Sequence, residues 1–268
     1  MKSCYTSTSF GHPNLPRANI LGVGISAINL GEATRLIVDA VRERRKGYVA
    51  VTGVHGVSEA QRDSEFRYIL NAAFLNTPDG MPMSWVGRWQ GFKKMDRVYG
   101  PDLMHEICAV TKDSGVRHFL YGGAPGAANK LKGALLSRFP GLCVCGTWTP
   151  PFRPLNVPEE HELFQLFEAT EPDICWVGLS TPKQERFMAA YLDKLPVTVM
   201  IGVGAAFDIH AGRVRQAPLW IQRSGLEWLF RLAQEPKRLW KRYLINNPLF
   251  VIRILAQLSR VRRYSLHG

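Results

Sequence analysis

The residues of this chain best suited to chemistry lie at 77–104, where a carboxylate and a guanidinium occur in one short span. Asp79 stands between Pro78 and Gly80, and Arg97 follows an acidic neighbour. Because proline fixes one backbone angle and glycine permits positive φ, the sequence predicts tight turns at both ends of the span. A carboxylate held in such a turn can act in catalysis, although Pro-Asp-Gly is also a common turn with a purely structural role.

The elements that must position these residues alternate along the chain. Apolar runs predict strands at 19–29 (with a turn), 48–52, 116–121, 142–147, 173–179 and 197–203. Helical spacing of apolar residues predicts helices at 30–45, 58–71, 103–114, 126–139, 159–170 and 187–194. This alternation predicts an α/β protein.

Three of the predicted strands end in glycine-rich or polar loops, at 122–126, 180–185 and 204–208. In an open parallel sheet, ligands bind beyond the carboxyl ends of the strands, so these loops are predicted to share one edge. Gly122, Gly123 and Gly126 precede a helix, and their amides suit a phosphate or nucleotide. A simple strand-to-helix turn would have the same sequence, so both interpretations stay open.

The loop at 181–185 is richer in polar groups than a helix start requires. Thr181 is predicted to cap the next helix and Pro182 to take its first position. Lys183 and Gln184 are then predicted to face the edge of the sheet. The structural alternative is a capped helix with a solvated first turn.

Composition limits the protein class. The chain has 268 residues, 46% of them apolar, which is enough for a large core. Five cysteines, mostly in apolar runs, predict reduced, buried thiols in a cytoplasmic protein. Cys143 and Cys145 are the only close pair, and no second pair with zinc spacing accompanies them, so no metal site is predicted. Residues 1–17 are predicted to be a flexible leader without an apolar signal core, and no window of the chain is predicted to span a bilayer.

Residues 213–268 differ from the rest of the chain in charge. They contain twelve Lys and Arg but only Glu227 and Glu235 as acids, and so carry ten of the net twelve positive charges. Tryptophans and large aliphatic residues alternate with the arginines, and Pro236 and Pro248 are predicted to break the segment into short helices. Trp beside Arg suits an anionic membrane surface, and the high apolar content favours that partner over nucleic acid. A helical subdomain packed on the body is the structural alternative.

Several motifs together resemble the WecG/TagA/CpsF glycosyltransferases. They appear in the order of the family and span about residues 20–250: PDG at 78–80, RVYGPDL at 97–103, YGGAPG at 121–126, VGLSTPKQE at 177–185, GVGAAFDIHAG at 202–212 and APLWIQRSGLEWLFRLAQEPKRLWKRYL at 217–244. The resemblance implies a Rossmann-like parallel-sheet core with helices on both faces at 18–212. It also implies a basic, amphipathic helical appendage at 213–268 that docks on the bilayer.

The resemblance also implies an activity. Family members transfer a sugar from a UDP-sugar to a polyprenyl-diphosphate-linked sugar, with inversion, in cell-surface polysaccharide synthesis. They act peripherally at the cytoplasmic face of the plasma membrane and need no metal or other cofactor. This chain has no Asp-x-Asp pair to hold a cation against a diphosphate, so cations and backbone amides are expected to stabilise the leaving UDP.

Roles for individual residues follow from the resemblance by position. Asp79 would be the general base, Arg97 would bind phosphate, and Gln184 would bind the donor's sugar or phosphate. Asp208 is a further candidate at the sheet edge, or only a cap. The remaining candidates for substrate binding are Thr52, His55, Gly122, Gly123, Gly126, Gly178, Pro182, Lys183 and Glu185. The candidates for membrane or acceptor binding are Trp228, Arg231, Arg238, Trp240 and Arg242.

The chain departs from the family pattern at two positions. The family usually has asparagine two residues after the threonine of its second strand, whereas Val54 follows Thr52 here and His55 comes next. His55 either substitutes for that asparagine or only caps a turn. Gln216 stands where the family has arginine, although Arg215 is adjacent.

Two other functions share features with this sequence. A non-catalytic nucleotide-binding or nucleic-acid-binding protein could use the same sheet edge and basic tail. A nicotinamide dehydrogenase is disfavoured, because no Gly-x-Gly-x-x-Gly follows the first strands. The sequence names neither sugar nor the linkage, and it leaves open whether the chain forms homo-oligomers.

Overall fold

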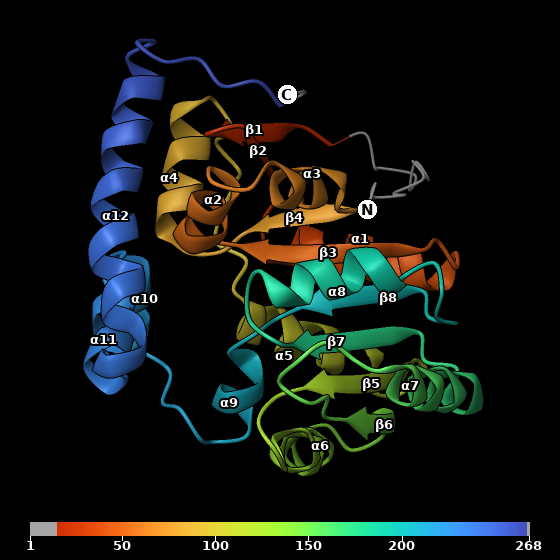
Figure 1. Ribbon diagram of the computed structural model, residues 1–268. Coiled ribbons are helices and arrows are strands. Elements are labelled where there is room, and N and C mark those ends of the chain that lie inside the picture. The colour runs from red at the N-terminus through yellow and green to blue at the C-terminus, as the bar shows by residue number, and fades with distance from the viewer. Residues whose placement is uncertain (1–14, 267–268) are drawn as a thin grey trace.

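The structure, a computed structural model, describes residues 15–266, so most of the predicted leader lies outside the described residues. Figure 1 shows an α/β core with a column of helices at one side. The elements in chain order are β1 (Arg17–Ile20), β2 (Val23–Ser26), α1 (Leu30–Arg42), β3 (Gly47–Thr52), α2 (Val54–Ala60), α3 (Ser64–Ala72), β4 (Leu75–Pro78), α4 (Met81–Trp89), α5 (Gly100–Thr111), β5 (Arg117–Gly122), α6 (Ala127–Arg138), β6 (Cys143–Trp148), α7 (Val157–Thr170), β7 (Ile174–Gly178), α8 (Lys183–Tyr191), β8 (Val199–Gly202), α9 (Ala206–His210), α10 (Leu219–Arg223), α11 (Glu227–Gln234) and α12 (Pro236–Leu258).

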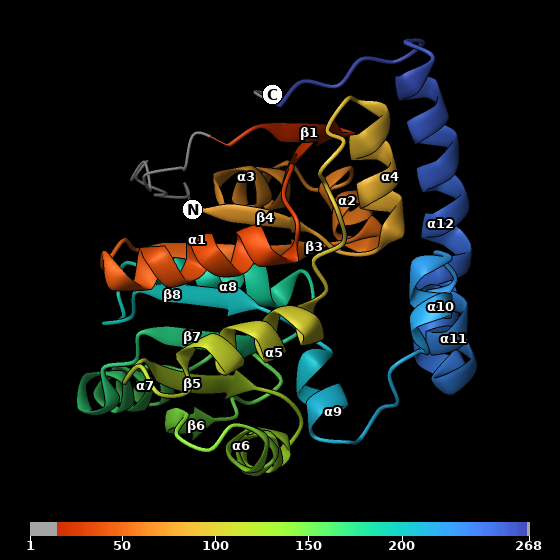
Figure 2. The same cartoon turned by 180° about the vertical axis from the view of Figure 1, so that it is seen from behind.

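A six-stranded parallel sheet forms the core, in the order β4-β3-β8-β7-β5-β6. Helices cover both faces: α3, α7 and α8 lie in front of the sheet in Figure 1, and α1 and α5 lie on the opposite face, in front in Figure 2. Successive side chains of a strand point to opposite faces, so Tyr48 and Ala50 join one apolar cluster while Val49 and Val51 join the other. The predicted α/β class is confirmed.

The segment predicted as one strand and a turn, 19–29, is instead part of a hairpin. β1 and β2 pair antiparallel, and the two-residue turn between them is Leu21-Gly22. Both turn residues have positive φ, 54° and 82°, as in the primed turns that fit the twist of a hairpin. The hairpin covers the edge of the sheet at β4, where the Asn76 backbone N–H donates to the Ser26 hydroxyl at 3.1 Å.

The stretch around Asp79 contains regular structure that the sequence analysis missed. β4 is short and half polar, yet Asn76 and Thr77 are fully buried because the hairpin packs beside them. Gly80, with φ of 85°, then turns the chain into α4, whose first turn contains Pro82. Asp79 therefore lies between a strand and a helix and not in an isolated turn.

Three local predictions were wrong. The helix predicted at 58–71 is two helices, because Asp63 accepts a hydrogen bond from the Phe66 N–H at 2.9 Å and starts α3 anew. Pro248 does not break the chain and lies inside α12. The carbonyl of residue 244 that Pro248 leaves without an N–H partner belongs to a residue that is 56% exposed, where water can bond it. Cys143 is exposed and not buried, because β6 is the edge strand of the sheet.

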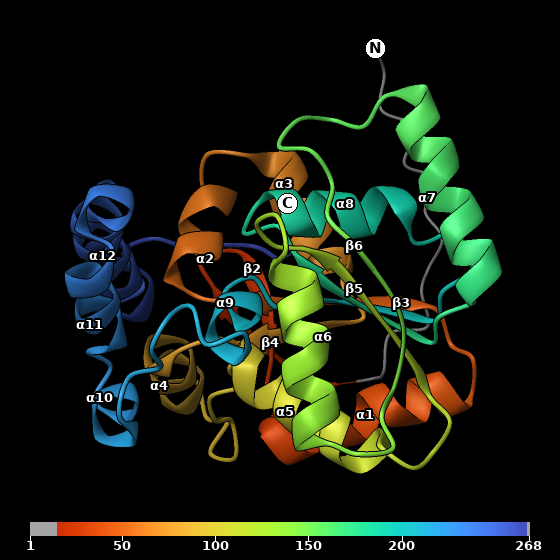
Figure 3. The same cartoon turned by 90° about the horizontal axis from the view of Figure 1, so that it is seen from below.

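Helices α10, α11 and α12 lie together beyond the carboxyl ends of the strands (Figures 1 and 3). α12 packs on α2 and inserts Phe250 and Ile254 into the same apolar cluster as Val57 and Met83. Gln257 then bonds the Asn19 carbonyl and the Leu21 N–H of the hairpin, at 2.7 and 2.8 Å. Within residues 15–266, no helix is long and apolar enough to cross a membrane.

The loop after β5 allows a test of the fold. An added Cβ on Gly122, whose φ is 117°, would lie 2.7 Å from the Gly178 carbonyl oxygen. Gly122→Ala is therefore expected to lower the free energy of unfolding by about 2–4 kcal/mol, through strain and backbone overlap. Denaturant unfolding measures this loss.

The matched control is Gly133→Ala in α6, where nothing lies within 4 Å of the added Cβ. Alanine in a helix interior is expected to raise the free energy of unfolding by about 0.5–1 kcal/mol. Equal unfolding midpoints for the two variants would contradict the close packing of the loops after β5 and β7.

Candidate active site

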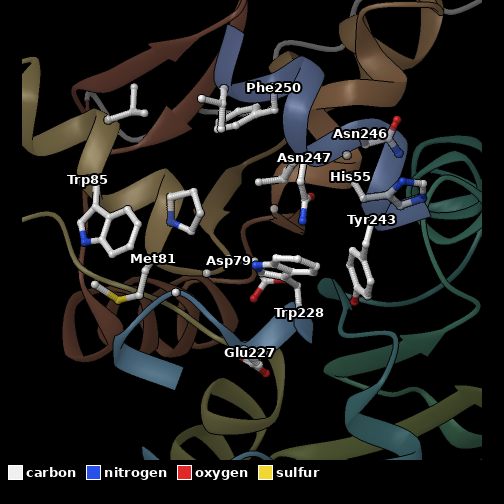
Figure 4. Close-up of a pocket in the computed structure, with 18 of the residues that line it drawn as sticks. His55, Asp79, Met81, Trp85, Glu227, Trp228, Tyr243, Asn246, Asn247 and Phe250 are labelled. Atoms are coloured by element: carbon white, nitrogen blue, oxygen red, sulfur yellow. The ribbon is translucent and has the colours of Figure 1, made fainter. Parts of the chain in front are cut away.

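A cavity of about 650 Å³ lies between the carboxyl ends of β3 and β4, helix α4 and the helices of residues 213–258. The side chains at one end are polar and charged, and include His55, Asp79, Glu227, Arg231 and Arg242. The other end is apolar and is lined from α4 and α12, by Trp85, Val86, Trp89, Val251, Ile254 and Leu255. Figure 4 shows Asp79 near the middle of the site, with Trp85 on one side and His55 and Tyr243 on the other.

Asp79 is fixed by its backbone and not by its side chain. Its N–H donates to the Thr52 carbonyl at 3.0 Å, and the Val98 N–H donates to the Pro78 carbonyl at 2.8 Å. A Cβ on Gly53 would lie 3.4 Å from Oδ2 of Asp79, so the glycine leaves room for the carboxylate. In the described part of the chain, no group donates a hydrogen bond to this carboxylate, which leaves it free to accept a proton.

The electrostatic environment weakens the acidity of Asp79. Burial and then the Glu227 carboxylate raise its pKa from 3.8 to about 6, against the lowering effect of Arg97, Arg231 and Arg242. Above pH 6 the group is ionised and remains a stronger base than an ordinary aspartate. These are properties suited to general-base catalysis near neutral pH.

Arg97 lies beside the cavity and is held by protein groups. Its Nη2 donates to Glu227 at 2.8 Å, and its Nη1 donates to Gln222 at 2.8 Å and to Asp102 at 3.4 Å. The guanidinium carbon lies 4.0 Å from the centre of the Tyr99 ring. The phosphate role predicted for Arg97 thus requires that a ligand share or replace these partners.

His55 faces the cavity from α2, the helix that follows β3. Burial and then the charge of Arg242 lower its pKa to about 4, so the ring is neutral at pH 7. Its Nδ1 lies 3.8 Å from Glu59, too far for a hydrogen bond. Thr52 ends β3 nearby and is buried, with its backbone carbonyl bound to Asp79.

The glycine loops lie together but outside the cavity lining. The Gly123 N–H donates to the Gly178 carbonyl at 2.9 Å, and Phe207 packs closely on both residues. Gly126, with φ of 77°, has nothing within 4 Å of an added Cβ. The structure therefore brings Gly122, Gly123 and Gly178 together at the sheet edge, as predicted, in a place separate from Asp79.

The loop at 181–185 differs from the prediction. Helix α8 begins at Lys183, with Pro182 as the preceding cap residue, and Thr181 caps no N–H. The Thr181 hydroxyl instead donates to the buried Glu185 carboxylate at 2.8 Å, which needs a donor there. Gln184 is 3% exposed and bonds Glu185, while the Lys183 ammonium lies 3.6 Å from the centre of the Phe152 ring, away from the cavity.

Asp208 is also outside the cavity. It lies on α9, its backbone carbonyl accepts from the Arg213 and Val214 N–H groups, and its carboxylate is 3.6 Å from Arg213. These contacts give it a structural role in the turn that leads toward α10. The residues predicted for membrane or acceptor binding divide in two: Trp228, Arg231 and Arg242 line the cavity, whereas Arg238 and Trp240 are exposed.

Many of the predicted residues have buried polar atoms without a hydrogen-bond partner. Among the described residues with such an atom, seven had been predicted from the sequence: Thr52, His55, Arg97, Gln184, Glu185, Arg231 and Arg242. Most buried polar groups in folded proteins are paired, so a group of unpaired donors and acceptors marks a place that a polar ligand can complete.

Other cavity residues were not predicted from the sequence, above all Glu227, Tyr99, Trp85 and Tyr243. Glu227 had a signal that could have found it, since it is one of two acidic residues among the many cations after residue 212. No sequence signal indicates Trp85 and Tyr243, because they line the cavity only where α4 and α12 face each other across it.

A parallel α/β sheet with charged side chains gathered beyond its carboxyl ends has the arrangement in which open α/β proteins bind their ligands. A sequence profile of the Glycosyl transferase WecG/TagA/CpsF family matches residues 18–264. The chain belongs to this family and is a glycosyltransferase, as the motifs predicted.

Two Bacillus proteins are similar to this chain, and both are named N-acetylglucosaminyldiphosphoundecaprenol N-acetyl-beta-D-mannosaminyltransferase. The protein of Bacillus subtilis is 28% identical over 198 residues, which cover 74% of this chain and 75% of that protein. The protein of Bacillus spizizenii is 28% identical over 214 residues, which cover 80% of each chain.

The raised pKa of Asp79 predicts a gain in stability when its charge is removed. The folded pKa of about 6 exceeds the ordinary 3.8, so ionised Asp79 destabilises the fold above pH 6 and has no such effect below 3.8. Asp79→Asn is expected to raise the free energy of unfolding by about 1–3 kcal/mol at pH 8.

Thermal unfolding at pH 8 and pH 5 measures this effect. The advantage of Asp79→Asn should shrink at pH 5, where the wild-type carboxyl is mostly protonated, so the lower pH is the internal control. If Asp79→Asn is less stable than wild type at pH 8, the prediction is wrong. The attraction of the Asp79 charge to Arg97, Arg231 and Arg242 would then stabilise the fold by more than burial of that charge destabilises it.

Proposed function

We propose that this glycosyltransferase moves a sugar from a UDP-sugar to a polyprenyl-diphosphate-linked sugar, with inversion and with Asp79 as the general base. The observation that carries the proposal is the division of the cavity. One end joins a carboxylate to arginines, and the other is apolar. An acceptor of this class has a sugar hydroxyl, a diphosphate and an isoprenoid chain in series, and each part matches a part of the cavity.

In the proposed reaction, the acceptor hydroxyl attacks the anomeric carbon of the donor sugar. The hydroxyl proton passes to the Asp79 carboxylate as the new carbon–oxygen bond forms. The bond to UDP breaks on the opposite face, and UDP leaves with the electron pair. One carboxylate is enough for such a displacement, because the diphosphate is already a good leaving group.

We assign the donor to the edge of the sheet. The loops at 122–126 and 178–185 would hold UDP with backbone amides, and Gln184 would bond its sugar or phosphate. Thr181 supports this placement, since it lines the cavity while belonging to the second of these loops. The donor would then extend from the glycine loops toward Asp79, with Arg97, Thr52 and His55 on its path.

We assign the acceptor to the cavity itself. Arg231 and Arg242 each have a buried Nε without a partner, and both face Asp79 from the helices of residues 213–258. Guanidinium groups suit a diphosphate, because each can bind two oxygens. Trp85, Val251 and Leu255 would contact the first isoprene units.

The names of the two relatives suggest substrates to test first. They describe an acceptor with N-acetylglucosamine on undecaprenyl diphosphate and transfer of N-acetylmannosamine. We propose an N-acetylhexosamine for both sugars of this chain. The pathway would be the synthesis of a cell-surface polysaccharide.

We also propose that residues 213–268 dock the enzyme peripherally on the cytoplasmic face of the plasma membrane. Large apolar side chains on α10 and α12 are exposed, among them Trp220 at 70% and Ile252 at 63%. Arg238 and Trp240 lie exposed on the same helices, which suits anionic headgroups. The leader at 1–17 and the core at 18–212 complete the proposed division of the chain.

UDP release tests the proposed reaction directly. A panel of UDP-sugars is assayed with and without polyprenyl-diphosphate N-acetylglucosamine, in the presence of EDTA. Wild type is expected to release UDP only with acceptor, and Asp79→Asn to lower the rate by about 10²–10⁴-fold. Because the base must be ionised, kcat/KM should rise with pH to a plateau above about 6.

The control is Asp39→Asn on α1, whose carboxylate pairs with Arg35 away from the site. Its rate should match wild type. Full activity of Asp79→Asn would exclude the proposed base, and loss of activity in EDTA would exclude a metal-independent reaction. UDP binding without release from any donor would favour the non-catalytic alternative.

Vesicle sedimentation tests the proposed docking surface. Replacing both Trp220 and Trp240 by alanine is expected to weaken binding to phosphatidylglycerol vesicles about tenfold or more, because each ring would lose apolar burial at the interface. Phe152→Ala is the control, since this residue is 92% exposed on the loop before α7. Equal losses in the two variants would contradict the assignment of the surface to α10 and α12.

A further inference from the structure

Helix α11 begins at Glu227, whose carboxylate faces the α/β domain of residues 18–212. Oε2 of Glu227 accepts from Nη2 of Arg97 at 2.8 Å, and the two side chains are only 15% and 10% exposed. From α10, Gln222 accepts from Nη1 of the same guanidinium at 2.8 Å. One arginine of the core thus binds the first two helices that follow residue 212.

The core holds Arg97 firmly from its own side. Asp102, in the first turn of α5, lies 3.4 Å from Nη1, and the Tyr99 ring lies under the guanidinium. Removing one partner of a buried ion pair leaves the other charge uncompensated, so this contact resists opening. The position of Glu227 relative to the sheet edge is therefore well defined.

Glu227 also lines the cavity that contains Asp79, so two carboxylates share one space. Like charges in a poorly solvated site make each carboxylate bind a proton more readily. The other charged groups that act on Asp79 are Arg97 from the loop before α5, Arg231 from α11 and Arg242 from α12. Tyr99 adjoins both carboxylates, and burial and then Glu227 raise the pKa of its hydroxyl.

We propose that Glu227 is a positioning residue with two linked effects: its ion pair with Arg97 closes α11 across the cavity, and its negative charge makes Asp79 a stronger base. This inference rests on the proposed function insofar as Asp79 is the base. It gives a role to a residue of the 217–244 motif for which the sequence predicted none. It also assigns a catalytic reason for an acidic residue in a strongly basic segment.

The two effects can be separated, because only the second needs a charge. Glutamine at position 227 keeps an oxygen that can accept from Arg97, and it removes the negative charge that faces Asp79. Asp102→Asn is the matched control: it removes a charge from the same arginine, and Asp102 is not among the groups that act on Asp79. Glu227→Ala also removes the charge and introduces no amide. If Glu227→Gln does not fold, the same titration can therefore be made with Glu227→Ala.

The experiment is a ¹³C NMR titration of the Asp79 carboxyl carbon in the full chain without substrates, with Asp79→Asn used for assignment. Glu227→Gln is expected to lower the midpoint by about 0.5–1 pH unit, and Asp102→Asn to change it by less than about 0.2. An unchanged midpoint in Glu227→Gln, or equal changes in both variants, would overturn the proposal.

Kinetics give the catalytic consequence. In Glu227→Gln, the acidic limb of the kcat/KM profile should move to lower pH with the midpoint, and the plateau of kcat should fall because the base is weaker. A fall in kcat with an unmoved limb would assign Glu227 a structural role only and would overturn the proposal. Activity that survives Asp79→Asn would instead contradict the proposed function. The titration would still show whether Glu227 shifts the midpoint of Asp79, because it is made without substrates and does not depend on catalysis.

Discussion

The structure depends on a balance of charge around one half-buried carboxylate. Asp79 follows an edge strand of the sheet, where its backbone is bonded to the neighbouring strand and its side chain has no donor. A lone ionised carboxylate in that place would be costly, and Arg97, Arg231 and Arg242 offset the cost. Two of these arginines come from residues beyond 212, so the cavity exists only where the sheet edge and the C-terminal helices meet. Glu227 then keeps the three cations from lowering the pKa of Asp79 too far.

Much of this arrangement could be predicted from the sequence. Alternating apolar runs predicted the α/β class, and the order of the motifs predicted the family, because both depend on short stretches of chain. The loops after β5, β7 and β8 were predicted to share one edge of the sheet because parallel strands end on the same side, whereas Asp79 was selected by its motif alone. The seven predicted residues with unpaired buried atoms belong to several of these motifs, which supports their grouping without establishing their roles.

The rest depends on contacts between distant parts of the chain. β4 is too polar to be recognised alone, and it is a strand because the hairpin of β1 and β2 buries Asn76 and Thr77. α12 continues through Pro248 because Phe250 and Ile254 pack on the core on one side while the unpaired carbonyl faces solvent. Thr181 bonds a buried Glu185 in place of a helix N–H, which no local pattern indicates. Arg231 and Arg242 face Asp79 for the same reason, whereas the composition of residues 213–268 indicates only that the segment is basic.

The return of the chain to its first hairpin has a consequence for synthesis. The Asn19 side chain donates to the Tyr264 carbonyl, across 245 residues, and the Asn71 side chain donates to the Leu266 carbonyl. The parallel sheet needs nothing beyond β8, so it can form while the C-terminal helices are still in the ribosomal exit tunnel. Helices α11 and α12 can pack beside Asp79 only after α12, which ends at Leu258, has emerged from the tunnel. Until then the nascent chain exposes the apolar surface on which Phe250 and Ile254 later pack. During this interval a chaperone or the membrane would have the largest apolar surface to bind.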